Sequence, residues 1–167
     1  MNPQILEAGK CSLVAEALRS WGVLKLRARG VSMLPTVWPG DLLTIQSHRP
    51  TQAEPGEIVL YMRRGRFFIH RVVSKSLTGN EIFLTTRGDC LAENDPPVRG
   101  RELLGKIIEV ERAGSRFSPP RKLSRFRRML AYVLRHWSLF RRAGLRLWAI
   151  RNRGHRQNEG TLVEAAT

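Results

Sequence analysis

The first candidate for a chemical role is a serine, in a loop that contains glycine and proline. It is Ser32, in the segment Gly-Val-Ser-Met-Leu-Pro-Thr at residues 30–36. A serine attacks a carbonyl carbon only if a base takes its proton and a hydrogen-bond donor stabilises the oxyanion. Gly30 would let the backbone approach a substrate, Met33 belongs to the same substrate loop, and Pro35 would stiffen it. Such a serine alone is usually an exposed turn residue, so the hypothesis needs partners elsewhere.

A histidine within an apolar segment is the candidate base. His70 lies in the sequence Phe-Phe-Ile-His-Arg-Val-Val at residues 67–73, which is typical of a strand. An imidazole titrates near neutral pH, so it is suited to accept the proton of a serine. The plainer interpretation is a strand histidine that bonds to a backbone carbonyl.

Two aspartates could orient this histidine. Asp89 follows Gly88, and Asp95 comes six residues later. An aspartate bonded to one ring nitrogen sets the tautomer and stabilises the imidazolium. Both could instead belong to surface turns, since Gly-Asp is a common turn pair. The sequence leaves the choice open, and we weakly favour Asp89 because Gly88 frees the backbone to aim it.

The elements that must position these residues are mostly short strands. Residues 4–20 have the spacing of an amphipathic helix that ends near Gly22, and an alternating strand follows from Val23. Further strands are predicted at 41–46, 57–62, 67–74, 81–86 and 104–111, separated by turns rich in glycine, proline and asparagine. This pattern predicts a mainly β, compact antiparallel domain. The expected division is an N-terminal helix at 1–22, a catalytic β domain at 23–113, a linker at 114–120, a basic amphipathic helical segment at 121–153 and a disordered tail at 154–167.

Positive charge is concentrated late in the chain. The net charge is +15, yet residues 1–120 hold 17 Lys/Arg and 12 Asp/Glu, whereas residues 121–156 hold 12 Lys/Arg and no acid. The segment 121–153 also contains an apolar stripe with Trp137, Phe140 and Trp148. This composition favours a helix on an anionic membrane surface. The alternatives are a helix packed on the β core and, less favoured, a nucleic-acid-binding segment.

Several classes of protein are excluded or disfavoured by composition. No stretch of 18 apolar residues exists, so no transmembrane helix is predicted, and residues 1–30 lack the pattern of a secretory signal. Cys11 and Cys90 match no metal-ligand spacing and are too few for a disulfide framework. We expect no metal and no cofactor, and a location in the cytoplasm or on the cytoplasmic face of a membrane.

Taken in order, the motifs resemble the signal peptidase superfamily of serine peptidases. Residues 30–36 with Pro-Gly-Asp at 39–41 are similar to its nucleophile box, and Pro-Gly-Glu-Ile-Val at 55–59 to the strand that follows. His-Arg-Val-Val at 70–73 occupies the box where many members carry lysine, which resembles the endoplasmic-reticulum and archaeal type. Gly88-Asp89 and Asp95 match the acidic positions of that type, and Gly-Lys-Ile-Ile at 105–108 resembles the closing strand.

The resemblance covers residues 24–111 and implies a β-clip fold and a serine endopeptidase. It implies that Ser32 is the nucleophile, that its backbone N–H helps to form the oxyanion hole, and that His70 acts as base and then as acid. The implied substrate is a protein or peptide segment that binds as an added strand and has small residues at the cut. The alternative hypothesis is a non-catalytic binding module on this fold, whose basic segment binds membrane or nucleic acid.

Overall fold

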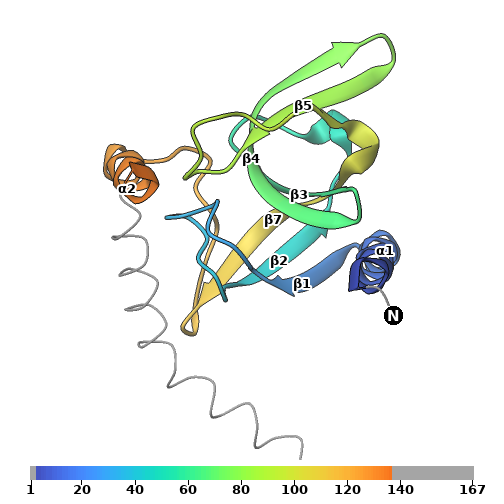
Figure 1. Ribbon diagram of the computed structural model, residues 1–167, viewed down its shortest axis with the longest axis horizontal. Coiled ribbons are helices and arrows are strands. Elements are labelled where there is room, and N and C mark those ends of the chain that lie inside the picture. Colours follow the sequence, from blue (N-terminus) through green and yellow to red (C-terminus); the bar gives the residue numbers. More distant parts are fainter. Residues whose placement is uncertain (1–2, 137–167) are drawn as a thin grey trace, which may run out of the picture.

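The protein is built around one antiparallel sheet. The computed structural model describes residues 3–136 (Figure 1). A helix, α1 (Pro3–Trp21), precedes the sheet, and a second helix, α2 (Arg125–His136), follows it. The strands are β1 (Val23–Arg27), β2 (Leu42–Ser47), β3 (Ile58–Arg63), β4 (Arg66–Thr78), β5 (Glu81–Arg87), β6 (Val98–Arg99), β7 (Leu103–Arg112) and β8 (Ser115–Phe117). Their order is β1-β2-β7-β3-β4-β5-β6, with β8 added to β7. The predicted mainly β, antiparallel class is therefore confirmed.

Strand β3 lies between two hydrophobic cores. Ile58 and Leu60 belong to a cluster that includes Leu18 of α1, whereas Val59 and Tyr61 belong to a second cluster. Successive side chains of a strand point to opposite faces, so a strand covered on both faces needs an unbroken apolar run. This explains why residues 58–61 lack the polar alternation of an exposed strand. In Figure 1, α1 lies against one end of the sheet, and the β4–β5 hairpin projects from the other.

The sequence located most of these elements. The predicted helix at 4–20 and the strands expected at 23–30, 41–46, 57–62, 67–74, 81–86 and 104–111 correspond to α1, β1, β2, β3, β4, β5 and β7. The short strand β6 was missed. Two residues of extended chain that pair with β5 leave too little periodicity to be recognised from sequence.

The linker predicted at 114–120 is partly wrong, because residues 115–117 form β8. Arg112 pairs with Ser115, so Ala113 and Gly114 make a two-residue hairpin loop. Both have positive φ, 49° and 79°, as the tight hairpin turns that match strand twist require. The sheet therefore extends past residue 113 to Phe117. Pro119 and Pro120 do stop it, because proline has no N–H to donate to a neighbouring strand.

Only the start of the predicted basic helical segment is described. Residues 118–124 form a strap that leads from β8 to α2, and α2 accounts for residues 125–136 of the segment expected at 121–153. The rest of that segment and the tail expected at 154–167 lie outside the described residues. Within residues 3–136, no helix is long and apolar enough to cross a membrane.

Replacing Gly105 with alanine is expected to destabilise the sheet. A Cβ atom there would lie 2.5 Å from the backbone oxygen of Gln46 and 2.9 Å from Ile45 Cγ2, so β2 and β7 would have to separate. We expect Gly105→Ala to lower the free energy of unfolding by about 1–3 kcal/mol, measured by urea denaturation. The exposed Ser76→Ala should change it by less than about 0.5 kcal/mol. Equal stability of Gly105→Ala and the wild type would contradict this packing.

Candidate functional site

The loop that carries Ser32 connects β1 to β2 and is anchored in its C-terminal part. The buried carboxylate of Asp41 accepts hydrogen bonds from the Trp38 backbone N–H (2.8 Å) and from two nitrogens of Arg112 (2.9 and 2.6 Å). Arg112 also donates to the backbone oxygen of Thr36 (3.0 Å). Charge-assisted hydrogen bonds are shorter and stronger than those between neutral groups, and a bidentate arginine pair also sets the geometry. Arg112 of β7 therefore anchors the Ser32 loop to the sheet.

Ser32, His70 and Asp95 form a continuous chain of hydrogen bonds. His70 Nε2 lies 3.0 Å from Ser32 Oγ, and His70 Nδ1 lies 2.6 Å from Asp95 Oδ2. A carboxylate can only accept, so with Asp95 ionised Nδ1 would carry the ring proton and Nε2 would be left to accept the Ser32 hydroxyl. This arrangement is compatible with the tautomer that a general base for serine requires.

Asp95 is held in place by its own neighbours. Its backbone N–H donates to the backbone oxygen of Thr86 (2.8 Å), and the Thr86 hydroxyl donates to Asp95 Oδ2 (2.6 Å). Tyr61 lies beside this pair. Burial, with a contribution from the Asp95 carboxylate, raises the pKa of Tyr61 to about 12, although a hydrogen bond with Thr86 opposes the shift. Tyr61 is therefore a neutral phenol at physiological pH.

Aromatic rings enclose His70. The rings of Tyr61 and Phe68 each meet the imidazole edge-on, with centroids 6.3 Å apart in both pairs. His70 is buried, and its ring orientation is set by these contacts as well as by Asp95. A side chain held in one orientation loses no further freedom when it reacts.

Asp89 does not orient the histidine, so the weak preference for it is wrong. Its carboxylate is paired with Arg71, whose Nε and Nη2 each donate at 2.8 Å, and it accepts the hydroxyl of Thr36 at 2.5 Å. His70 and Arg71 are neighbours in a strand, so their side chains point to opposite faces and each takes a different aspartate. Sequence analysis gave Arg71 and Thr36 no role; the alternation of the strand was the available signal.

Gly88 and Asp89 nevertheless shape the site through the backbone. A Cβ atom on Gly88 would lie 2.7 Å from the backbone oxygen of Ser32. That oxygen also accepts the N–H of Cys90 (2.9 Å). The turn after β5 is therefore packed directly against the backbone of Ser32. Glycine is needed at position 88 because this approach leaves no room for a side chain.

The predicted substrate loop is only partly open. Gly30 is exposed and has a φ of 82°, which favours glycine, and Ser32 is half-buried. The side chains of Met33 and Pro35 are buried, and Met33 belongs to the core beneath α1. Met33 and Pro35 therefore support the loop from inside, and Gly30 and Ser32 remain on its outer side.

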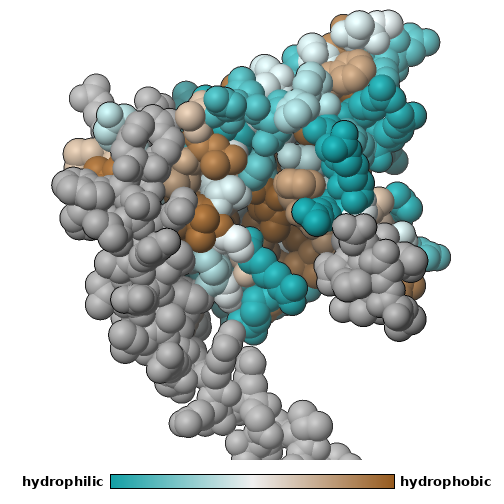
Figure 2. All heavy atoms as spheres, in the orientation of Figure 1, coloured by the Kyte–Doolittle hydropathy of each residue, from teal (hydrophilic) through white to brown (hydrophobic). Residues whose placement is uncertain are grey.

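Apolar side chains cover one face of β4, the strand that carries His70. Figure 2 shows a hollow of hydrophobic side chains at the centre of the molecule, in the region of β3, β4 and β7 in Figure 1. Partly buried apolar residues on β1 and β4 pack against the first core, among them Leu26, Phe67 and Ile69. Phe67 and Ile69 alternate with Phe68 and His70 along β4, so this apolar surface lies on the face of the strand opposite the imidazole.

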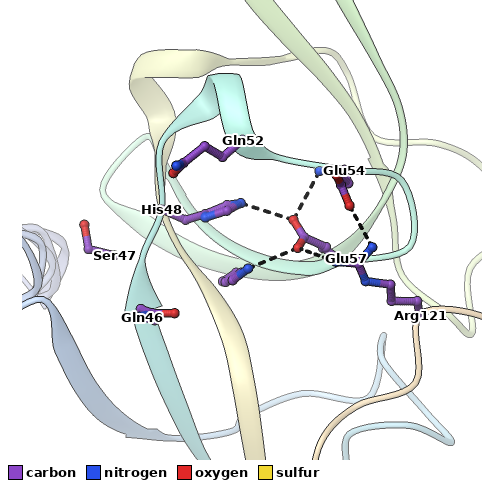
Figure 3. Close-up of a pocket in the computed structure, with 8 residues that line it drawn as sticks. Gln46, Ser47, His48, Gln52, Glu54, Glu57 and Arg121 are labelled. Atoms are coloured by element: carbon purple, nitrogen blue, oxygen red, sulfur yellow. Dashed lines mark hydrogen bonds and ion pairs between the residues drawn. The ribbon is translucent and has the colours of Figure 1, made fainter.

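A separate polar pocket has none of Ser32, His70 and Asp95 in its lining. Its volume is about 370 Å³, and it is lined by Gln46, Ser47, His48, Gln52, Glu54, Glu57, Lys106 and Arg121 (Figure 3). The buried Glu57 carboxylate lies at its centre and contacts His48 Nε2 (3.1 Å), Lys106 Nζ (3.2 Å) and Arg121 Nη2 (3.4 Å). Among residues 3–136 no group of three or more His, Cys, Asp or Glu side chains could hold a metal. Through its ion pairs, Glu57 connects the turn before β3 with the residue after β2, with β7 and with the strap.

Comparison of the chain with protein-family models and with curated proteins found no match. The chemistry of the site is therefore argued from its own residues.

Glu57 is expected to make stability depend on acid pH. Burial by itself would raise the pKa of this carboxyl, but the Glu54 N–H, Lys106 and His48 together lower it below the usual 4.5. A lowered pKa in the folded state adds stability above the unfolded-state value, and this is lost as pH falls through the folded value. We expect the unfolding free energy of the wild type to fall below about pH 4.5, and that of Glu57→Gln to fall less steeply.

The measurement is urea unfolding at several pH values between about 3 and 7. Glu93→Gln, an exposed residue, is the matched control and should follow the wild-type curve. Parallel curves for Glu57→Gln and the wild type would show that the cluster does not contribute to acid sensitivity.

Proposed function

We propose that the protein is a serine endopeptidase of the Ser-His-Asp type that cleaves an extended segment of a protein or peptide, as in signal-peptide or leader processing. The observation that supports it is the hydrogen-bonded chain from Ser32 through His70 to Asp95, whose members are 38 and 25 residues apart in sequence. Side chains this distant meet in this order only if the fold brings them together, and the order is that of nucleophile, base and orienting acid.

The reaction follows from the proton positions. Ser32 Oγ would attack the scissile carbonyl carbon while His70 Nε2 takes its proton, and Asp95 would stabilise the imidazolium that forms. His70 would return the proton to the leaving amine as the C–N bond breaks, leaving an ester on Ser32. Water activated by the same ring would then hydrolyse the ester. The backbone N–H of Ser32 is the proposed oxyanion donor. These steps need no metal or cofactor.

The proposed substrate lies extended across the loop and strand that carry Ser32 and His70. An extended chain can pair with strand backbone, while its side chains enter pockets on alternate sides. We expect small side chains at the cut, as the resemblance implies. The proposed setting is the cytoplasm or the cytoplasmic surface of a membrane, where the basic segment would meet anionic lipid.

Replacement of the nucleophile is the direct test. Purified wild type and Ser32→Ala would be incubated with extended peptides that carry alanine-flanked sites, and the products identified by mass spectrometry. We expect cleavage by the wild type at a defined bond, and a loss of about 10⁴-fold or more in kcat for Ser32→Ala with an unchanged unfolding curve. If Ser32→Ala and the wild type process every peptide equally, or neither cleaves any, the non-catalytic binding module replaces this proposal.

Replacing each of the two aspartates should have a different effect, on activity for Asp95 and on stability for Asp89. Asp95→Asn would donate to the ring and favour the wrong tautomer, so we expect kcat to fall by about 10³–10⁴-fold with little change in stability. Asp89→Asn leaves Arg71 without its charge partner, so we expect a loss of about 3 kcal/mol in unfolding free energy. Activity assays below the unfolding temperature and urea denaturation separate the two effects. The assignment fails if Asp89→Asn is fully stable and as inactive as Asp95→Asn.

A further inference from the structure

The strap that leads to α2 is anchored next to the site. Arg71 Nη1 donates to the backbone oxygen of Pro120 (2.7 Å), and Arg121 Nη1 donates to Glu54 Oε2 (2.7 Å). A Cβ atom on Gly56 would lie 2.6 Å from the backbone oxygen of Arg121, so the strap lies directly on the turn before β3. Backbone contact together with ion pairs holds the chain at the point where α2 begins.

The inner face of α2 rests on the catalytic loops. Leu130 packs in a small cluster with Leu34 and Cys90, and Ala131 is buried beside them. The Cys90 thiol lies 3.8 Å from the backbone oxygen of Ala131. Leu34 is two residues after Ser32, and Cys90 is the residue that bonds to the Ser32 backbone. The rotation of α2 about its own axis is therefore set by the loops that carry the site.

The outer face of α2 exposes large apolar side chains. Phe126, Met129 and Tyr132 are 67%, 59% and 58% exposed. They are spaced three residues apart, so they form a stripe along one side of the helix. Hydrophobic side chains reach the surface at the position of α2, at the left of Figure 2. A soluble domain normally buries such a stripe, so its exposure indicates a binding surface.

Charge identifies the occupant of this surface. The segment 121–136 contains six Lys/Arg and no Asp/Glu. Apolar side chains on a strongly basic helix fit an anionic bilayer, where the apolar stripe enters the boundary between headgroups and acyl chains and the cations meet the headgroups. We propose that α2 binds the surface of an anionic lipid bilayer through Phe126, Met129 and Tyr132.

This surface would keep the peptidase close to membrane-bound substrates. Because Leu130 and Ala131 fix α2 on the Ser32 and Cys90 loops, a bilayer in contact with the outer stripe lies at a constant distance from the site. The relevance of this distance rests on the proposed function, whereas lipid binding by α2 does not.

Vesicle binding by the full chain tests the proposal. Co-sedimentation would compare vesicles of phosphatidylcholine alone with vesicles that contain about one quarter phosphatidylglycerol. We expect binding to the anionic vesicles, weakened severalfold between about 0.1 and 0.5 M salt. Phe126→Ser/Met129→Ser should lower the partition coefficient about tenfold or more. Leu77→Ser, which removes an equally exposed apolar residue (70%) from the β4–β5 hairpin, should bind as the wild type does.

Further variants keep the outcomes distinct. Lys122→Glu, an exposed residue of the strap, should weaken binding to anionic vesicles even if the double variant were unstable. Ser32→Ala should bind vesicles fully, so a failed peptidase assay leaves the lipid result intact. The proposal is overturned if the wild type binds neither vesicle at low salt, or if a folded Phe126→Ser/Met129→Ser binds as well as the wild type. It is also overturned if short RNA binds more tightly than anionic vesicles and displaces them.

Discussion

The buried carboxylate of Asp89 is the constraint on which the site depends. A carboxylate with almost no exposure is tolerated only when its partners are complete, and here they are the Arg71 guanidinium and the Thr36 hydroxyl. These partners come from β4 and from the Ser32 loop, while Asp89 itself comes from the turn after β5. One neutralised charge therefore joins the three chain segments that supply the proposed nucleophile, base and orienting acid.

The two faces of β4 carry side chains with different partners. His70 points to the face where Tyr61, Phe68 and Asp95 enclose it, and Arg71 points to the face where Asp89 lies. Strand geometry makes this separation unavoidable, because adjacent side chains alternate. A reactive histidine can then be held beside a structural arginine without competing for the same carboxylate. The position of one pair fixes the position of the other, since both project from the same rigid backbone.

The same arginine connects the site to the C-terminal part of the chain. Arg71 donates to the strap as well as to Asp89, and Glu57 holds Arg121 of the strap from the other side. Beyond the strap, α2 packs on the Ser32 and Cys90 loops. A continuous set of packed and charged contacts thus connects α2, whose outer face is the proposed binding surface, to Ser32. This arrangement makes the proposed membrane contact of α2 compatible with a rigid Ser32 loop.

By itself, the sequence determined the mainly β class, most of the strands, and the identities of Ser32, His70, Asp89 and Asp95 as candidates, because periodicity, turn residues and motif spacing are local. The tertiary structure decided which aspartate meets His70, since that choice depends on the faces of β4 and on the path of the chain after β5. It also decided that β8 replaces part of the linker, that Met33 is buried, and that Arg71, Thr36 and Arg112 support the loop. These are contacts between residues distant in sequence, and no local pattern records which side chains a folded sheet brings together.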